Sequence, residues 1–141
     1  MFFKPMLLPM LALVLLTFLV WLYLFARRIP EILRKKIDVR DLADRAEGHK
    51  LLTDSAAASN NLKNLFEMPV LFYTAVLLSL LLMVQDSFLV WLSWGFVGFR
   101  YAHSAVHCTY NDVNHRFAVY AASCLFLLLI WIRLASYILM H

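Results

Sequence analysis

The stretch SNNLKNLFEMPVLFYTAVLLSLLLM, residues 59–83, begins with polar residues and continues as a long apolar run. It contains one carboxylate, Glu67, and one proline, Pro69, just before that run. About 20 apolar residues are enough to cross the hydrocarbon core of a bilayer as a helix. We therefore expect a membrane helix whose entrance carries chemically useful side chains.

The composition of the whole chain is that of a membrane protein. Its 141 residues are 63% hydrophobic and include only three glycines, which is too apolar for a soluble globule of this size. The length fits one domain and is sufficient for four crossings of about 20 residues each. We predict an all-α fold, a four-helix transmembrane bundle in which residues 1–141 form a single integral membrane domain.

Four apolar segments predict helices at about 6–27, 54–84, 88–109 and 116–138. Pro69 lacks an N–H and should bend the second helix just past its polar entrance. Gly95 and Gly98 lie one turn apart on the third helix and could allow close contact with a neighbouring helix. Arg133 has few polar neighbours at helical spacing, so we expect it to extend its charge to the membrane surface.

The loop at about 28–53 contains most of the thirteen Lys and Arg residues. These cations alternate with acids and lack the interleaved aromatics of a nucleic-acid site, so we expect no nucleic-acid partner. An excess of Lys and Arg is typical of cytoplasmic loops. Apolar residues at helical spacing between Ile29 and Ile37 suggest that part of the loop lies on the membrane surface.

Polar side chains gather where three of the expected helices reach the side of the loop. In chain order they are Lys63, Asn64, Glu67, Arg100, His103, His107, Arg116 and Tyr120. Spacings of three, four or seven residues place the members from each helix on one face. An ionised residue at the membrane centre costs roughly 2.5–3.5 kcal/mol, so such residues normally face a partner or a wet cavity. We expect a positively charged pocket with one carboxylate, suited to an anionic ligand.

Several of these residues have a second interpretation. Asn64 and Glu67 could form a helix-capping pair. Lys63 and Arg116 could be interfacial cations that reach the headgroups. Tyr120 could belong to the aromatic belt at the membrane surface. The joint placement of these residues is therefore a stronger signal than any one of them.

The remaining ligand-type residues favour structural roles. His103 and His107 could bind a metal, but no acid or cysteine shares their face, so we expect hydrogen bonding and no metal site. Cys108 and Cys124 lie in or beside apolar helices without the spacing of a metal or redox pair. We interpret both as buried thiols.

Three motifs in order resemble the MAPEG family, the membrane-associated proteins of eicosanoid and glutathione metabolism. They are NxxExP at residues 64–69, RxxH at residues 100–103, and the pair Arg116 and Tyr120. The strings NLFEMPVLFY and FRYAHSAVHCTYNDVNHRFAVY look like a bacterial branch of that family, and the resemblance covers about residues 6–137. It implies a homotrimer of four-helix subunits in the bacterial inner membrane, with glutathione bound between subunits near the cytoplasmic face.

The resemblance also implies roles for individual residues. Asn64 and Glu67 would hold polar and amino groups of glutathione, while His103 and Tyr120 would contribute hydrogen bonds. Arg116 matches the arginine proposed to stabilise the glutathione thiolate, and a nearby cation does lower the pKa of a thiol.

Three further cations or histidines complete the expected site. Arg100 would bind a carboxylate of glutathione or brace the pocket. Lys63 and His107 lie on the same helix faces as the matching motifs. An arginine at the end of the first helix contributes in relatives, and either Arg27 or Arg28 could match it.

Two functions follow from this pattern. The first is a glutathione-dependent membrane transferase or peroxidase that acts on a lipophilic electrophile from the bilayer. The alternative is a non-catalytic trimeric membrane protein whose polar cluster is structural or binds a lipid headgroup. A transporter is disfavoured because the polar residues cluster at one end of the expected bundle.

Overall fold

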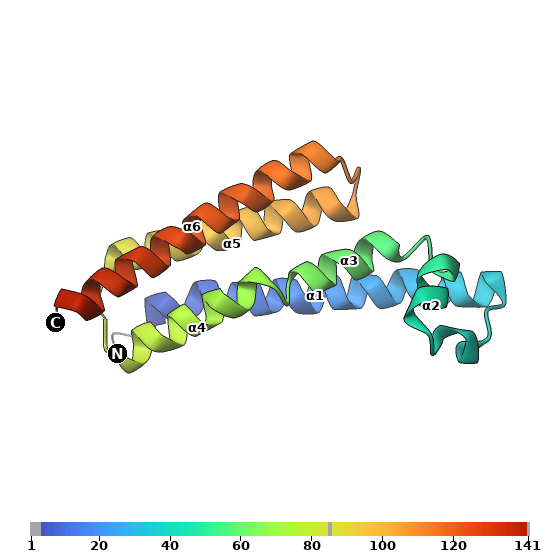
Figure 1. Ribbon diagram of the computed structural model, residues 1–141, viewed down its shortest axis with the longest axis horizontal. Coiled ribbons are helices and arrows are strands. Elements are labelled where there is room, and N and C mark those ends of the chain that lie inside the picture. The colour runs from blue at the N-terminus through green and yellow to red at the C-terminus, as the bar shows by residue number, and fades with distance from the viewer. Residues whose placement is uncertain (1–3, 85, 141) are drawn as a thin grey trace.

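The computed structural model describes residues 4–84 and 86–140, whose regular structure is entirely helical. The elements are α1 (Lys4–Lys35), the 3-10 helix η1 (Val39–Leu42), α2 (Arg45–Leu51), α3 (Ala56–Asn64), α4 (Met68–Leu81), α5 (Ser87–Cys108) and α6 (Val113–Met140). The predicted all-α class is confirmed. Figure 1 shows α5 and α6 as an antiparallel pair beside α1 and the α3–α4 segment.

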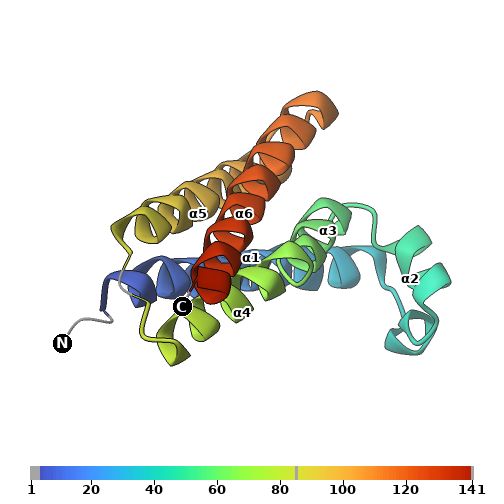
Figure 2. The same ribbon diagram turned by 60° about the vertical axis from the view of Figure 1, so that its left-hand side comes forward.

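The two ends of the chain lie at the same end of the molecule, and η1 and α2 lie at the other (Figure 1). Figure 2 shows the same separation from a second direction, with η1 and α2 beyond the helices of the main body. This arrangement puts the charged loop at one pole.

Apolar packing joins α1, α4, α5 and α6. Leu13, Phe72, Phe96 and Ile130 contribute one side chain from each helix, and all four are fully buried. The rings of Phe72 and Phe96 stack with their centroids 4.8 Å apart. In a bilayer such contacts act through close packing, because lipid tails are as apolar as the side chains.

Three helical segments are long and apolar enough to cross a membrane. They are residues Pro5–Lys35, Ala56–Leu81 and Val113–Met140. Helix α5 has 22 residues but falls outside this group, since it carries Arg100, His103 and His107. These three side chains are at most 2% exposed, so α5 keeps its polar groups away from the surrounding medium. A fourth crossing through α5 remains a prediction.

Helix α1 is longer than the sequence indicated. It continues to Lys35 instead of ending near residue 27, and Pro9 and Pro30 both lie inside it. Its 32 residues span about 48 Å, well beyond the hydrocarbon thickness of a bilayer. The segment around Leu33, which we expected on the membrane surface, continues this helix instead.

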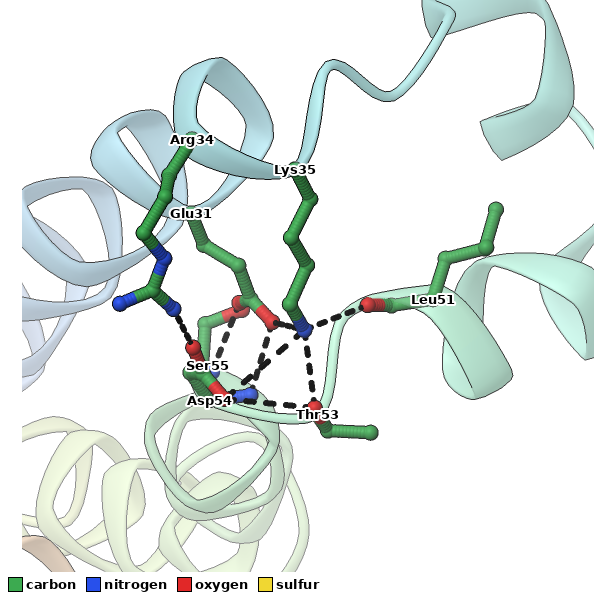
Figure 3. Close-up of polar contacts among 7 residues, drawn as sticks. All are labelled: Glu31, Arg34, Lys35, Leu51, Thr53, Asp54 and Ser55. Carbon is green, nitrogen blue, oxygen red and sulfur yellow. Dashed lines mark hydrogen bonds and ion pairs between the residues drawn. The ribbon is translucent and has the colours of Figure 1, made fainter.

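The end of α1 fixes the start of α3 through a buried carboxylate (Figure 3). Glu31 is 2% exposed and accepts hydrogen bonds from the backbone N–H groups of Asp54 (2.8 Å) and Ser55 (2.9 Å). Lys35 pairs with the same carboxylate at 2.6 Å and also donates to the carbonyl of Leu51. The side chain of Ser55 does not cap α3, so Glu31 performs that role from another helix.

The second span is broken, whereas we expected one helix over residues 54–84 with a bend. Helix α3 ends at Asn64 and α4 begins at Met68. Pro69 cannot donate to the carbonyl of Leu65, and its ring crowds that carbonyl. The break therefore precedes the proline by one turn and lies inside the polar entrance.

Backbone hydrogen bonds tighten within this break. The N–H of Phe66 donates to the carbonyl of Lys63 at 2.9 Å, an i to i−3 bond of the 3-10 type. Glu67 occupies the N-cap position of α4, but its side chain makes no capping hydrogen bond. The capping interpretation of this carboxylate is therefore wrong, and Glu67 is available for other contacts.

Gly95 allows α6 to pack closely on α5. A Cβ atom added at Gly95 would overlap the ring of Phe126. At Gly98 such an atom would meet nothing within 4 Å among the described residues. Of the two glycines that the sequence singled out, only Gly95 permits a close helix contact in the described chain.

Arg133 pairs with Asp86 in the α4–α5 turn, a partner that the sequence did not indicate. Its Nε lies 2.6 Å from Asp86 Oδ2, and Asp86 Oδ1 accepts from the N–H of Phe88 at 2.8 Å. Partial burial alone would raise the pKa of Asp86. The hydrogen bonds from Arg133 and Phe88 outweigh that effect and hold this pKa below its usual value.

We predict that Gly95→Ala destabilises the protein and that Gly98→Ala does not. Overpacking of a helix contact costs about 1–3 kcal/mol, whereas alanine at an open helical position gains about 0.5–1 kcal/mol over glycine. Thermal unfolding of both variants in the same detergent measures the difference. Equal midpoints would contradict the close contact at Gly95.

We also predict that the ion pair of Asp86 makes stability sensitive to acid. Because the folded-state pKa of Asp86 is lowered, its contribution is complete above the pKa of the unfolded chain and is lost as pH falls through the folded value. Thermal midpoints between about pH 6 and pH 2 should fall more steeply for the wild type than for Asp86→Asn. Parallel curves for the two proteins would count against this contribution.

Candidate functional site

A cavity of about 190 Å³ lies between the α3–α4 break, α5 and the start of α6. Its lining residues are Asn64, Glu67, His103, Val113, Arg116, Phe117 and Tyr120. Five of these residues are among those selected from the sequence. The cavity therefore combines a carboxylate, an amide, an imidazole, a guanidinium and a phenol.

Arg100 does not line this cavity but lies behind two residues that do, Asn64 and Tyr120. It is fully buried, and its Nη2 donates to the backbone carbonyl of Asn64. Its guanidinium carbon lies 5.6 Å from the ring centroid of Tyr120, within cation–π range. The Nε and Nη1 groups are buried and make no hydrogen bond to the described residues. Such unsatisfied donors are costly, which makes an anionic partner favourable here.

His103 and His107 follow Arg100 along α5. Both are 2% exposed, and their ring centroids lie 5.6 Å apart. The ring of His103 is 5.9 Å from that of Tyr120, and His103 alone of the pair lines the cavity. The Nδ1 atoms of both histidines have no hydrogen-bond partner in the described chain. His103 can therefore offer a hydrogen bond to a ligand, while His107 lies outside the lining.

The start of α6 positions Arg116 at the cavity. Asp112 accepts from the N–H of His115 at 2.9 Å, which caps the helix, and this bond holds the pKa of Asp112 below its usual value. Asn111 has a φ of 50°, a left-handed conformation that asparagine tolerates. Its side-chain oxygen accepts from Arg116 Nη1 at 2.8 Å. The turn thus fixes the guanidinium while leaving it other N–H donors.

Glu67 is exposed at the break and makes no hydrogen bond or close ion pair among the described side chains. Its negative charge still interacts with the positive charge of Arg100. A carboxylate in this position is expensive in a membrane unless a cationic group meets it. It is the natural partner for an ammonium group on a ligand.

Lys63 does not join this cavity. Its Nζ lies 3.2 Å from His49 Nε2, and it lines a separate cavity beneath α2. Lys63 and Asn64 are consecutive residues, so their side chains leave α3 about 100° apart. The sequence placed both residues on one face of a helix. In the structure they line two different cavities.

Two residues of the site were not found by sequence reasoning. Cys124 is a free, half-buried cysteine one helical turn after Tyr120 on α6. Residues four positions apart share a helix face, so the spacing of Tyr120 and Cys124 could have indicated that both lie near the site. Asn61 is fully buried and ties α3 to α5 through Ser104 (3.1 Å) and Cys108 (3.3 Å). These contacts set the register between the two helices that line the cavity.

Comparison with known proteins identifies the family. The model of the MAPEG family matches residues 6–136, nearly the whole chain and all of the cavity. No curated protein and no solved structure gave a match. Together with the three membrane-spanning candidates, the match makes this an integral membrane protein and confirms the resemblance seen in the motifs at residues 64–69 and 100–103. The chain belongs to the MAPEG family.

Proposed function

We propose that this protein is a glutathione-dependent membrane transferase or peroxidase that acts on a lipophilic electrophile. The carrying observation is the cavity at the α3–α4 break, which groups Asn64, Glu67, His103, Arg116 and Tyr120. Glutathione transferases and peroxidases both occur in the MAPEG family. The described chain offers no nucleophile that these residues clearly activate, so a thiol from a co-substrate would fill that role.

The residues of the cavity fit the groups of glutathione. Glu67 would pair with its ammonium group, and Asn64 and Tyr120 would hydrogen-bond its peptide groups. The unsatisfied donors of Arg100 suit a carboxylate, and the Nδ1 atom of His103 suits a further hydrogen bond. When bound, glutathione would supply a thiol whose thiolate form is the nucleophile. Arg116 would favour that form by its positive charge.

The small size of the cavity supports a site shared between subunits. Ligand pockets commonly measure roughly 300–1,000 Å³, and this cavity encloses about 190 Å³. A homotrimer in which a neighbouring subunit closes the open side would complete it. We therefore propose the trimer implied by the family, with α5 as the fourth crossing of each subunit.

The same arrangement suggests how the protein lies in the membrane. The loop with η1 and α2 would face the cytoplasm, because it carries the excess of Lys and Arg. Four crossings would then place both chain ends on the far side, in keeping with their common end in Figure 1. We propose the bacterial inner membrane as the location. Phe117, which lines the cavity and is 69% exposed, would give a lipophilic substrate access from the bilayer.

A second candidate is a non-catalytic trimer in which the polar cluster is structural or binds a lipid headgroup. The hydrogen bond from Arg100 to the backbone of Asn64 favours it. This contact holds α5 to the broken helix without any ligand. The two candidates differ in whether Glu67 and Arg116 respond to glutathione.

We predict that Arg116→Ala lowers the rate of glutathione conjugation by about 10²-fold, the usual effect of losing one charge-stabilising group at a reacting centre. A glutathione analogue with a methyl group in place of the thiol should bind both proteins equally well, because Arg116 acts on the thiolate. Steady-state rates and calorimetric titration in detergent measure the two effects. Arg40→Ala, in η1 and away from the cavity, is the charge-matched control. Normal turnover by Arg116→Ala would refute the assigned role.

We predict that Glu67→Gln weakens glutathione binding while the oligomer stays intact. A hydrogen bond to a charged group contributes about 1.5–3 kcal/mol, so the dissociation constant should rise roughly 10- to 100-fold. Thermal stabilisation by glutathione and the mass of the detergent-free particle by native mass spectrometry are measured on the same sample. Dissociation of the oligomer with no change in ligand response would favour the structural candidate.

A further inference from the structure

A second cavity, separate from the candidate site, lies where α2 folds over α1 and α3. It measures about 290 Å³ and is lined by Arg28, Leu42, Arg45, Gly48, His49, Leu52, Ala56, Ser59 and Lys63. We define its polar lining, Arg28, Arg45, His49, Ser59 and Lys63, as the basic pocket. The polar lining contains no carboxylate.

Five of the six acids over residues 28–54 are engaged elsewhere, and the sixth, Asp41, does not line the pocket. Asp38 and Asp44 cap η1 and α2 by accepting from backbone N–H groups. Glu47 pairs with Lys50 at 2.7 Å, and Asp54 pairs with Arg34. Glu31 is held by Lys35 and the start of α3 (Figure 3). The loop therefore uses its carboxylates to build the fold around the pocket and leaves the pocket itself positive.

The cations of the basic pocket lack acidic partners. None of the ion pairs among residues 4–84 and 86–140 involves Arg28, Arg45 or Lys63. The Nε atom of Arg28 is buried and has no hydrogen-bond partner within the described chain. Three cations around one cavity repel one another unless an anion enters. An anion that enters this cavity would meet all three cations and no lining acid.

The donor groups define the chemistry of that ligand. Lys63 Nζ lies 3.2 Å from His49 Nε2, and an ammonium group can only donate hydrogen bonds. Two guanidinium forks, one ammonium and the hydroxyl of Ser59 then surround the cavity as donors. Arginine binds phosphate through paired hydrogen bonds, and lysine adds a point charge. The geometry points to a binding site for a phosphate oxyanion in the basic pocket.

The position of the pocket favours a lipid as the source of that phosphate. Arg28 follows directly after the apolar run of α1, at the level where a membrane helix meets the headgroups. Basic pockets beside membrane helices bind the headgroups of anionic phospholipids. A free phosphate ion presents the same chemistry, so the test has an arm for each source.

The experiment compares the purified protein in detergent with added phosphatidylglycerol, phosphatidylcholine or inorganic phosphate. Thermal midpoints are measured against the concentration of each, and native mass spectrometry counts retained lipid. Phosphatidylglycerol should raise the midpoint of the wild type, and phosphatidylcholine should not. Arg45→Gln and Lys63→Gln should each raise the half-maximal concentration about fivefold, the effect of one cation at a membrane surface.

Two controls make the result specific to the pocket. Arg40→Gln removes the same charge from the same loop but does not line the pocket, so it should respond like the wild type. Arg45→Lys keeps the charge and should retain most of the effect, and equal ligand-free midpoints show that each variant folds. Arg45→Gln should also keep the response to glutathione, which separates this proposal from that for the candidate site.

Each outcome decides the proposal. A rise with phosphatidylglycerol alone supports a lipid ligand, and an equal rise with inorganic phosphate supports a soluble one. Absence of any rise overturns the site, and so does an identical response in Arg40→Gln, Arg45→Gln and Lys63→Gln. Displacement of bound lipid by glutathione would assign the pocket to the candidate site and overturn its independence.

Discussion

The hydrogen bond from Arg100 to the carbonyl of Asn64 is the contact on which the polar end of the molecule depends. Pro69 breaks the second span, and a broken helix leaves backbone carbonyls without their usual donors. In a membrane each such group costs several kcal/mol. Arg100 supplies a donor from α5 and also brings a full charge into the interior. The break and the buried cation therefore stabilise one another, and neither is favourable alone.

The same break determines what Glu67 can do. Its backbone φ of −93° and ψ of −99° lie outside the helical region, and its side chain does not cap α4. In a continuous helix the carboxylate would follow the face of Asn64 at regular spacing. Here it is released at the junction, beside a cavity that it lines together with Asn64 and Arg116. The break in the helix thus leaves a carboxylate without a capping partner beside the cavity, where a cationic group of a ligand could pair with it.

Helical periodicity brought five of the eight selected residues to one cavity, because it depends on local geometry. Asn64, Glu67, His103, Arg116 and Tyr120 line one cavity, as their spacings and short connecting loops indicated. The continuous helix over residues 54–84 was wrong, although Pro69 was the correct signal. The missed contacts, such as those of Glu31 and Arg133, join residues more than 20 positions apart. Such pairs follow from tertiary packing, which no local pattern contains.

Helix α3 contributes residues to two cavities whose linings differ in charge. Asn64 faces a cavity that holds one acid and cationic neighbours, while Lys63 faces a pocket whose polar lining has no acid. One residue along the helix turns the side chain by about 100°, so adjacent positions can serve different ligands. Because Glu31 fixes the start of α3 and Asn61 ties it to α5, this division is set by the fold itself.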